Sequence, residues 1–403
     1  MDILFVVPYA PNLVRTRPYN FIRYLTERGN RVTVLTLWTN EREQEDLAQL
    51  EKFVHRVWAM PMPLWRSMWN CVLALPGGKP LQSVYSWQPE LMAFLNGDVH
   101  FDVVHVEHLR GSRYGLSLQK LGHWPVVWDS VDCISHLFRQ AAARSDSLTG
   151  KLRSRFELKR TERYEGWLLD QFKRVLVTSS VDGQALAALS NNGVAKRISV
   201  LPNGVDVDYF APDTAVSREE NAIIVSGKMS YHANVTMTMY LANEIMPHVW
   251  ARRPNTQLWI VGKDPTREIR ALGEKTAVTV TGAVPDLRDY VRRAAVAAAP
   301  IPYGAGIQNK VLEAMSCATP VVVTPQAVAA LDIEPGRDLL VADTPQAFAD
   351  ALLNLLDDPQ RRQRLGQAGR AYVQERHHWN NIAAQLETIY CDAIRLHAGS
   401  AAG

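Results

Sequence analysis

The chain has 403 residues, 47% of them hydrophobic and 21% charged, which is typical of a globular protein with two domains of ordinary size. The formal net charge of +3 is too small to indicate bulk electrostatic binding to nucleic acid. The four cysteines, Cys71, Cys133, Cys317 and Cys391, form neither a CxxC pair nor a zinc-binding pattern, so they are expected to be reduced thiols in the cytoplasm.

The beginning of the chain, MDILFVVPYAPN, leads directly into an apolar strand, without a basic segment before it. No signal peptide is therefore expected. No uninterrupted apolar run reaches about 18 residues, so no membrane-spanning helix is expected either. These patterns predict a cytoplasmic protein.

The first half of the chain alternates short apolar runs with longer helical patterns, which predicts βαβ units and a parallel sheet. A helix is expected at residues 17–29, because apolar residues recur at helical spacing and a glycine follows as a stop. Strands are expected at 3–7, 31–37, 102–107, 125–130, 174–180 and 197–203.

The second half starts the same alternation again. Pro, Asn, Gly and Asp cluster in LPNGVDVDYFAPD (201–213), which indicates the boundary between two regular regions. Two sheets built one after the other fit two Rossmann-like domains better than one large sheet. A last amphipathic helix is expected at 379–396. Strands are expected at 221–227, 256–262, 278–284, 294–301 and 319–325.

Two regions have an unusual composition. Residues 57–87 contain four tryptophans among Met and Pro, and residues 139–174 contain ten Lys or Arg against five Asp or Glu. One interpretation is an irregular apolar insertion and a solvated helix face. The alternative is a surface that touches the inner membrane, because Trp favours the membrane interface and basic side chains favour anionic lipid.

A loop with two glycines leads into the helical pattern at 309–316. Gly304 and Gly306 would let bare backbone approach a ligand, and the helix start would offer N–H groups and a positive dipole end to a diphosphate. Lys310 adds a full positive charge in the first turn, where stability alone would disfavour a cation. An ordinary loop is the alternative explanation of the two glycines taken alone.

Two further features extend this predicted anion site. Glu313 lies three residues after Lys310 on the same helix face, where a carboxylate can accept hydrogen bonds from both hydroxyls of a ribose. Gly227 and Lys228 follow the carboxyl end of an expected strand, which is where open α/β sheets bind ligands. Alone, this pair fits a turn with a solvated lysine. Together with Lys310, it predicts two cations that converge on one diphosphate.

At these segments the chain resembles the retaining GT-B glycosyltransferases of family 4. The resemblance spans nearly the whole chain, and it is closest to a bacterial subgroup associated with exopolysaccharide assembly. It rests on LPNGVD (201–206), Gly227-Lys228 within GKMSYHANV, TGAV (281–284), GAGIQNKVLEAMSCATPVVVT and the closing HHWNNIAAQLETIY.

The resemblance implies an α/β GT-B fold: two Rossmann-like domains facing a cleft, with a C-terminal helix that crosses back to the first domain. The acceptor-side domain would comprise residues 1–204 with the helix 379–398, and the nucleotide-sugar-binding domain residues 205–378. The implied activity is sugar transfer from a nucleotide diphosphate sugar to a polysaccharide or lipid-linked acceptor in surface glycan synthesis. A soluble small-molecule acceptor and a non-catalytic nucleotide-binding protein are the alternatives.

The resemblance also implies roles for residues. Glu313 matches the second glutamate of the family's E-x7-E motif, which holds the ribose, and Lys228 and Lys310 match positions near the diphosphate. No cofactor and no metal are expected, because the lysines and the helix dipole would supply the charge that a divalent ion supplies elsewhere. The expected donor site consists of Gly227, Lys228, Val284, Gly304, Gly306, Ile307, Gln308, Asn309, Lys310 and Glu313.

The chain also departs from the family pattern. The first glutamate of E-x7-E falls at Ala305, which leaves the donor sugar open and supports the non-catalytic alternative. The first loop, PYAPNLVRTRPYN, lacks the usual glycine pair. It contains Arg15 and Arg17, for which binding of a phosphate-bearing acceptor and plain solvent exposure are the two interpretations.

A histidine at the end of an N-domain strand commonly faces the donor sugar in this family. Here the corresponding region, PVVWDSVDCIS, contains Asp129 and Asp132, and His108 follows the preceding strand. These three residues are the catalytic candidates, with a structural role as the alternative for His108. Retaining transfer requires stabilisation of an oxocarbenium-like transition state and of the departing nucleotide diphosphate.

Overall fold

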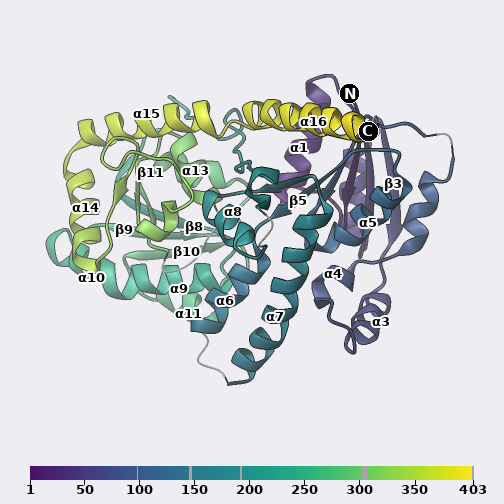
Figure 1. Cartoon of the computed structure of the whole chain (residues 1–403). Helices are drawn as coiled ribbons and strands as arrows, with labels where there is room; N and C mark the ends of the chain where they lie inside the picture. Colours follow the sequence, from purple (N-terminus) through teal and green to yellow (C-terminus); the bar gives the residue numbers. More distant parts are fainter. Residues whose placement is uncertain (98, 145–147, 191–192, 302–306, 402–403) are drawn as a thin grey trace. The chain divides into compact units, whose positions relative to one another are not determined.

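The computed structural model describes residues 1–97, 99–144, 148–190, 193–301 and 307–401 (Figure 1). The chain divides into two compact units. The first unit is Met1–Pro202 together with the chain from Ile382 onward, and the second is Asn203–Asn381.

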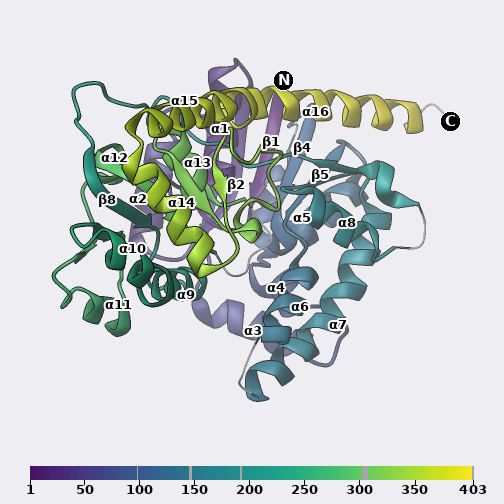
Figure 2. The same ribbon diagram turned by 90° about the vertical axis from the view of Figure 1, so that its left-hand side faces the viewer.

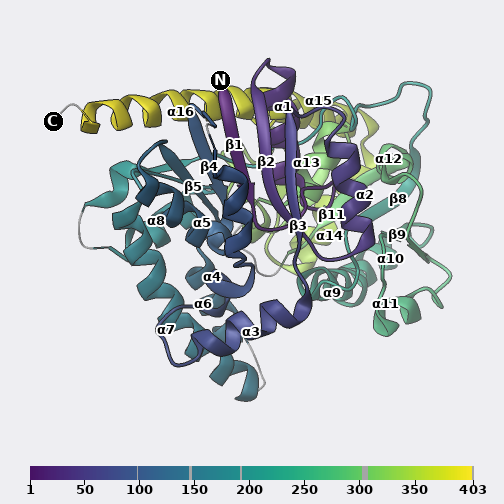
Figure 3. The same ribbon diagram turned by 90° about the vertical axis from the view of Figure 1, so that its right-hand side faces the viewer.

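The first unit is built on a parallel sheet that has seven strands within the described residues, in the order β3-β2-β1-β4-β5-β6-β7. Figure 3 shows β3, β2, β1, β4 and β5 side by side in that order. The strand order reverses between β1 and β4, and ligands bind at such a switch point in doubly wound sheets. The strands are β1 (Asp2–Val7), β2 (Arg31–Trp38), β3 (Arg56–Pro61), β4 (Val103–Glu107), β5 (Val126–Val131), β6 (Arg174–Val177) and β7 (Ile198–Val200).

Both faces of this sheet are covered by helices, which explains why its central strands are continuous apolar runs. All residues of β1 from Ile3 to Val7 are fully buried. α5 packs against β4 and β5. The helices of this unit are α1 (Thr16–Glu27), α2 (Glu41–Leu50), α3 (Leu64–Ala74), α4 (Leu81–Tyr85), η1 (Pro89–Leu95), α5 (His108–Leu121), α6 (Ile134–Arg144), α7 (Leu148–Gln171), α8 (Ser180–Ala187) and η2 (Val194–Arg197).

The last helix, α16 (Trp379–Ala401), begins in the second unit and continues in the first. Its residues Ile382, Leu386 and Tyr390 recur at helical spacing and are fully buried. The Tyr390 hydroxyl makes a hydrogen bond of 2.9 Å with Nδ1 of His105, which lies in β4. The expected return of the C-terminal helix to the first domain is confirmed.

The second unit contains a parallel sheet with six strands within the described residues, in the order β10-β9-β8-β11-β12-β13. Its switch point lies between β8 and β11, which pair side by side. The fold is therefore α/β with two Rossmann-like domains, as the sequence predicts. The strands are β8 (Glu219–Ser226), β9 (Gln257–Val261), β10 (Val278–Gly282), β11 (Ala294–Ala299), β12 (Val321–Val323) and β13 (Leu340–Val341).

Helices cover both faces of the second sheet as well. α13 and α14 pack against β11 and β12 (Figure 2), and α12 packs against β8 and β11. The helices are α9 (His232–Tyr240), η3 (Leu241–Ile245), α10 (Met246–Arg252), α11 (Arg267–Leu272), α12 (Leu287–Arg293), α13 (Asn309–Ser316), η4 (Pro325–Val328), α14 (Pro345–Asp357) and α15 (Pro359–Arg376).

Two of the differences between the structure and the sequence prediction concern the first unit. The expected strand 174–180 ends at Val177, because the Ser179 side chain accepts a hydrogen bond from the Asp182 N–H and begins helix α8. Residues 57–87, expected as an irregular insertion, contain most of β3 and the helices α3 and α4. The second difference matters for the surface of the first unit.

Candidate active site

The expected diphosphate site lies at the switch point of the second sheet. Gly227 follows β8, and Lys310 is in the first turn of α13, which follows β11. A Cβ atom added to Gly227 would lie 3.4 Å from Cε of Lys310 and 2.7 Å from Nδ2 of Asn234. The two segments that the sequence predicts to converge therefore lie side by side, and a side chain at position 227 would crowd the Asn234 amide rather than Lys310.

Close backbone contacts connect the loops that follow β8, β9 and β10. The Gly227 N–H donates to the Val261 carbonyl at 3.1 Å, and the Gly262 N–H donates to the Gly282 carbonyl at 3.2 Å. A Cβ on Gly262 would lie only 1.7 Å from the Gly227 carbonyl oxygen, which excludes every other residue type there. Val284, expected to line the base, is half-buried two residues after Gly282.

Lys310 and Glu313 titrate near neutral pH because both are shielded from water. Burial lowers the pKa of Lys310 to about 8, and the charge of Glu313 offsets only part of that change. Burial raises the pKa of Glu313 to about 7, again with a smaller opposing contribution from Lys310. Lys310 donates a long hydrogen bond of 3.4 Å to Oε1 of Gln308. A lysine in this state gains stability from an anionic ligand.

Lys228 is held differently. Its side chain is exposed, while its backbone is fixed: the carbonyl oxygen accepts hydrogen bonds from Nδ2 of Asn234 and from the Tyr231 N–H, both at 3.0 Å. Within the described residues, neither Lys228 nor Lys310 forms an ion pair. The second switch point therefore carries two cations whose charges no described carboxylate neutralises.

The start of α13 is also open to a ligand. Gln308, the N-cap residue, makes no side-chain capping hydrogen bond, and the first turn contains no acidic residue. Oδ1 of Asn309 is buried and has no hydrogen-bond partner in the described part of the chain. Ile307 is buried in the hydrophobic core. Gly304, Gly306 and Ala305 lie outside the described residues.

The first unit has a buried polar cluster at its own switch point. Nε of Arg17 lies 2.8 Å from Oδ2 of Asp129, with side-chain exposures of 4% and 0%. Nε2 of His105 lies 3.6 Å from the same oxygen, and Tyr390 closes the cluster through the other ring nitrogen. Burial alone would raise the pKa of Asp129, but the charges of Arg17 and His105 hold it well below its ordinary value.

This cluster changes the interpretation of Arg17. The sequence analysis expected either an exposed loop arginine or a phosphate ligand. Exposure is wrong, because Arg17 lies in the first turn of α1, is buried, and also donates to the Leu201 carbonyl at 3.0 Å. Its observed contacts hold Asp129 and the end of the first unit, so a ligand-binding role for Arg17 stays a prediction.

Arg15 is more accessible. Its side chain is 34% exposed, and one Nη atom lies 2.9 Å from Oε1 of Glu43. The other donates to the Ala10 carbonyl at 3.0 Å, and the guanidinium lies over the Tyr9 ring. These contacts hold Arg15 within the loop that follows β1, so its expected acceptor-binding role also stays a prediction.

His108 occupies a strained position directly after β4. Its backbone φ is +64°, in the left-handed region that histidine rarely adopts. Its Nδ1 accepts a hydrogen bond of 3.2 Å from the Arg110 N–H. Burial lowers the pKa of His108 to about 4. The ring is therefore neutral near pH 7. Because Nδ1 accepts a hydrogen bond, the ring proton is on Nε2, which can donate a hydrogen bond.

Two carboxyl groups at the carboxyl edge of the first sheet have raised pKa values. Burial, followed by repulsion from Asp129, raises the pKa of Glu107 to about 8, and its Oε1 accepts a hydrogen bond of 3.1 Å from the Tyr9 hydroxyl. Burial and the charge of Asp182 raise the pKa of Asp132 to about 6. Oδ1 of Asp132 accepts from Oγ1 of Thr178 at 3.2 Å.

Glu107 was not among the candidates from the sequence, although it directly precedes His108 at the end of an expected strand. Its place at the carboxyl end of an expected strand was the sequence signal by which Glu107 could have been found. Of the three catalytic candidates, Asp129 is committed to the ion pair with Arg17. Asp132 and His108 are half-buried, and a carboxyl with a pKa near neutrality can take or give a proton at physiological pH.

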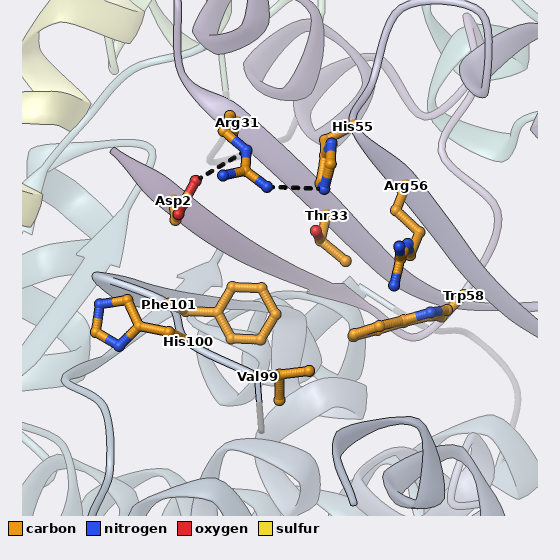
Figure 4. A pocket seen from close by; sticks show the side chains of 9 residues that line it. All are labelled: Asp2, Arg31, Thr33, His55, Arg56, Trp58, Val99, His100 and Phe101. Carbon is orange, nitrogen blue, oxygen red and sulfur yellow. Dashed lines mark hydrogen bonds and ion pairs between the residues drawn. The ribbon is translucent and has the colours of Figure 1, made fainter. Parts of the chain in front are cut away.

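A cavity of about 220 Å³ lies at the opposite edge of the first sheet, at the amino ends of its strands (Figure 4). Asp2, Arg31 and Arg56 line it, and these residues begin β1, β2 and β3. Arg31 lies 3.3 Å from Asp2 and 3.0 Å from Nε2 of His55. Open α/β sheets bind ligands at the carboxyl edge, so this cavity is separate from the candidate site.

Two features are absent from the described residues: a metal-binding cluster and a membrane-spanning helix. No group of three His, Cys, Asp or Glu side chains in this part of the chain is arranged to hold a metal ion. None of the helices built from these residues is both long and apolar enough to cross a membrane.

Two family models match the chain. Residues 14–209 match "Glycosyltransferase Family 4", and residues 220–358 match "Glycosyl transferases group 1". The two matches follow one another and together include most of the chain.

Relatives with similar sequences are also named as glycosyltransferases. A GDP-mannose-dependent monoacylated alpha-(1-6)-phosphatidylinositol monomannoside mannosyltransferase of Corynebacterium glutamicum is 28% identical over 215 residues, 47% of this chain. The alignment spans 55% of that relative, about half its length. A D-inositol 3-phosphate glycosyltransferase of Paenarthrobacter aurescens is 26% identical over 73% of each chain.

Solved structures share the fold over the whole length. HepE of Anabaena, in complex with UDP and glucose, has a TM-score of 0.69 at 16% identity, covering 97% of this chain and 100% of its own. Sucrose-phosphate synthase of Thermosynechococcus elongatus has a TM-score of 0.68 at 16% identity, covering 98% and 99%. Together the two family matches show that the chain belongs to the glycosyltransferases, and the solved structures show that it has the GT-B fold.

Proposed function

We propose that the protein transfers a sugar from a nucleotide diphosphate sugar, with retention of anomeric configuration, to a lipid-linked or polysaccharide acceptor in surface glycan synthesis. The observation that carries this proposal is the switch point of the second unit. There Lys228, Lys310 and the open start of α13 offer positive charge and N–H groups, and no described carboxylate pairs with either lysine.

The diphosphate is the part of the donor that this arrangement fits best. A diphosphate gains negative charge as the bond to the sugar breaks, and fixed cations and N–H groups stabilise that charge most when they are shielded from water. Lys310 is shielded in this way, since burial lowers its pKa to about 8. Bound phosphate would raise that pKa again and keep the ammonium group charged. On this proposal the transfer needs no metal ion.

The nucleoside is proposed to lie beside the diphosphate. Glu313 is on the same helix as Lys310, one turn further on, and its carboxylate would accept hydrogen bonds from the ribose hydroxyls. The backbone near Val284 follows β10, whose end contacts Gly262 in the neighbouring loop. Backbone groups there would contact the edge of the base.

The sugar-side chemistry is assigned to the first unit. Asp132, with its pKa raised to about 6, and the neutral ring of His108 are the two half-buried candidates that can exchange or share a proton with a hydroxyl. Asp129 would position its neighbours rather than exchange a proton, because its charge is already paired with that of Arg17. Arg15 is the candidate for an anionic group on the acceptor.

The relatives support a phosphorylated acceptor. One is named for a phosphatidylinositol mannoside, which is a lipid, and another for D-inositol 3-phosphate, which is soluble. The lipid-linked acceptor is the one proposed here, and a soluble phosphorylated acceptor is the outcome that would replace it.

A thermal-shift screen with nucleoside diphosphates and their sugars tests the donor site, because a ligand that binds the folded state raises its melting temperature by mass action. One nucleoside diphosphate should stabilise the protein, and its sugar conjugate should release free nucleotide when an acceptor is present. Proton NMR of the product would then show whether the anomeric configuration is retained. Stabilisation by none of the nucleotides would contradict the proposal.

Two lysine variants serve as test and control in the same screen. Lys310→Met removes the charge and keeps most of the side-chain volume, so stabilisation by the nucleotide should be lost while the melting temperature of the free protein is kept. Lys275→Met changes an exposed lysine of the same unit and should leave the nucleotide effect unchanged. Addition of EDTA should leave transfer intact.

A further inference from the structure

Helix α3 exposes its apolar side chains instead of burying them. Six of its large hydrophobic side chains are between 48% and 67% exposed, and the only fully buried residue of the helix is Ser67. A surface helix of a soluble protein normally turns its apolar stripe toward the core. The exposed residues are Leu64, Trp65, Met68, Trp69, Val72 and Leu73.

The orientation of α3 is fixed by polar contacts on its other side. Nδ2 of Asn70 donates to the Trp87 carbonyl at 2.8 Å, and Arg66 forms an ion pair of 2.7 Å with Glu90. Just beyond the helix, the Leu75 carbonyl accepts a hydrogen bond of 2.6 Å from Arg160 of α7. These contacts leave Trp65 and Trp69 exposed to solvent, and Figures 1 and 3 show α3 at the edge of the first unit.

The segment that carries this apolar surface, from residue 52 to residue 89, contains basic residues and no acidic ones. No Asp or Glu occurs between Glu51 and Glu90. Lys79, shortly after α3, is exposed, and so are Lys159 and Arg163 on α7, the helix that contacts the end of α3 through Arg160. The apolar face therefore has basic neighbours on its own segment and on the adjacent helix.

We propose that α3 is an interfacial helix that docks the first unit on an anionic lipid bilayer. Trp65 and Trp69 would enter the headgroup region together with the neighbouring Leu, Met and Val side chains, while Lys79 and the basic side of α7 contact the lipid phosphates. Helices that lie in the membrane surface combine these two features: Trp and Leu on one face, and cations beside it.

The composition of the surface favours a bilayer over a protein partner. A large exposed apolar patch marks an interaction site of some kind. Complementary charge distinguishes the candidates: an anionic leaflet attracts each nearby Lys or Arg with about 1 kcal/mol, and an acid-free segment of this length presents nothing that such a leaflet repels. A second copy of the chain would bring the same cations together.

The inference extends the proposed function, because a lipid-linked acceptor resides in a membrane, yet vesicle binding requires neither donor nor turnover. The two proposals can therefore fail separately. The nucleotide screen tests the donor site of the second unit, and vesicle flotation tests α3 of the first.

The experiment is flotation of the full chain with vesicles of phosphatidylcholine alone and of phosphatidylcholine mixed with phosphatidylglycerol. The protein should float with the anionic vesicles, less at high salt, because the ionic contribution is screened. Trp65→Ser with Trp69→Ser should lower the bound fraction at least about tenfold, since two buried aromatic anchors are lost. Lys79→Glu should lower it by a smaller factor.

A matched control uses exposed apolar groups of the same unit outside α3. Leu121 and Val200 are 48% and 47% exposed, and the pair Leu121→Ser with Val200→Ser should float like the unaltered protein. Wild-type protein that stays unbound, or an α3 variant that floats equally well, would overturn the proposal. So would a dimer in solution that becomes a monomer in the α3 variant, since α3 would then contact a second copy.

Discussion

Each unit of the protein has a switch point, between β1 and β4 in the first and between β8 and β11 in the second, and the two differ in how their charges are balanced. In the first, Arg17, Asp129, His105 and Tyr390 bind one another in the core. In the second, no described carboxylate pairs with Lys228 or with Lys310. At the first switch point the charges balance one another, and on the proposed function a ligand balances those of the second.

This difference shows how to interpret charged residues at the edge of a parallel sheet. Both switch points have arginine or lysine at the position where such sheets bind ligands, so position alone does not identify a binding residue. The pKa values do separate them. The pKa of Asp129 is held below its ordinary value by its partners, whereas burial lowers the pKa of Lys310 to about 8 and the charge of Glu313 offsets only part of that change.

The largest effect is expected in the first unit, from Arg17→Met. This change leaves the Asp129 carboxylate buried without its main partner, which costs about 3–5 kcal/mol in unfolding free energy. Denaturant unfolding followed by circular dichroism would measure the loss. Arg15→Met is the control, because its pair with Glu43 is partly exposed and should contribute at most about 1 kcal/mol. Equal losses of unfolding free energy would mean that the buried Arg17–Asp129 pair stabilises the fold no more than the partly exposed Arg15–Glu43 pair does.

The next effect is expected in the second unit, from Lys310→Met. Loss of one group that stabilises transition-state charge typically slows a reaction by about 10²–10³-fold. The transfer rate should fall by that factor, measured with the donor identified in the nucleotide screen. The melting temperature of the free protein should stay the same or rise, because a desolvated charge is removed. A transfer rate that stays within about twofold of the wild-type rate would remove Lys310 from the diphosphate site, since such a small change is far below the loss expected for a charge-stabilising group.

The third prediction concerns pH. Lys310 has a folded pKa of about 8 without ligand, so it is charged below that pH and becomes neutral above it. Bound diphosphate raises its pKa, and binding above pH 8 must therefore take up a proton. The affinity for the nucleoside diphosphate should fall above pH 8 with a slope approaching about tenfold per pH unit. Calorimetric titrations between pH 7.5 and 9 would measure it, and Lys310→Met should make the profile flat.

The smallest effect is expected from Tyr390→Phe, which removes the hydrogen bond between α16 and His105. One buried hydrogen bond contributes about 1 kcal/mol. The unfolding free energy should fall by that amount, with no change in nucleotide binding. Tyr19→Phe is a suitable control, because the Tyr19 ring packs on Phe53 and its hydroxyl has no hydrogen bond within the described residues. A loss as small as that of the control would show that the cluster does not depend on the tyrosine.

Much of the fold could be predicted from the sequence, because its central strands are buried on both faces and are therefore short continuous apolar runs. β1, β4 and β11 are of this kind. β3 was missed, since it begins with Arg56, ends with Pro61 and is only half-buried. β13 has two residues, too few to leave a pattern.

The candidate donor site could be predicted better than the catalytic one. Glycine next to lysine at a strand end, and lysine at a helix start, are local patterns, and the fold brings these two segments together. The role of Arg17 depends on Asp129 and Leu201, which are distant in sequence. Burial of such a residue follows only from tertiary packing. The pKa of Glu107 has the same origin, since Tyr9 and Asp129 come from other strands or loops.

The position of α16 has a consequence for how the chain is made. Most of the first unit precedes the second unit in the chain, yet the helix that supplies Tyr390 and Glu387 to the first unit follows the second. Until that helix is made, His105 lacks the hydroxyl that caps its ring, and Arg28 and Asn30 lack the carboxylate that binds both of them. The second unit, whose residues are contiguous, can mature earlier. The unit that is made earlier is thus completed later, and a nascent chain must keep the incomplete first unit from aggregating until α16 has emerged.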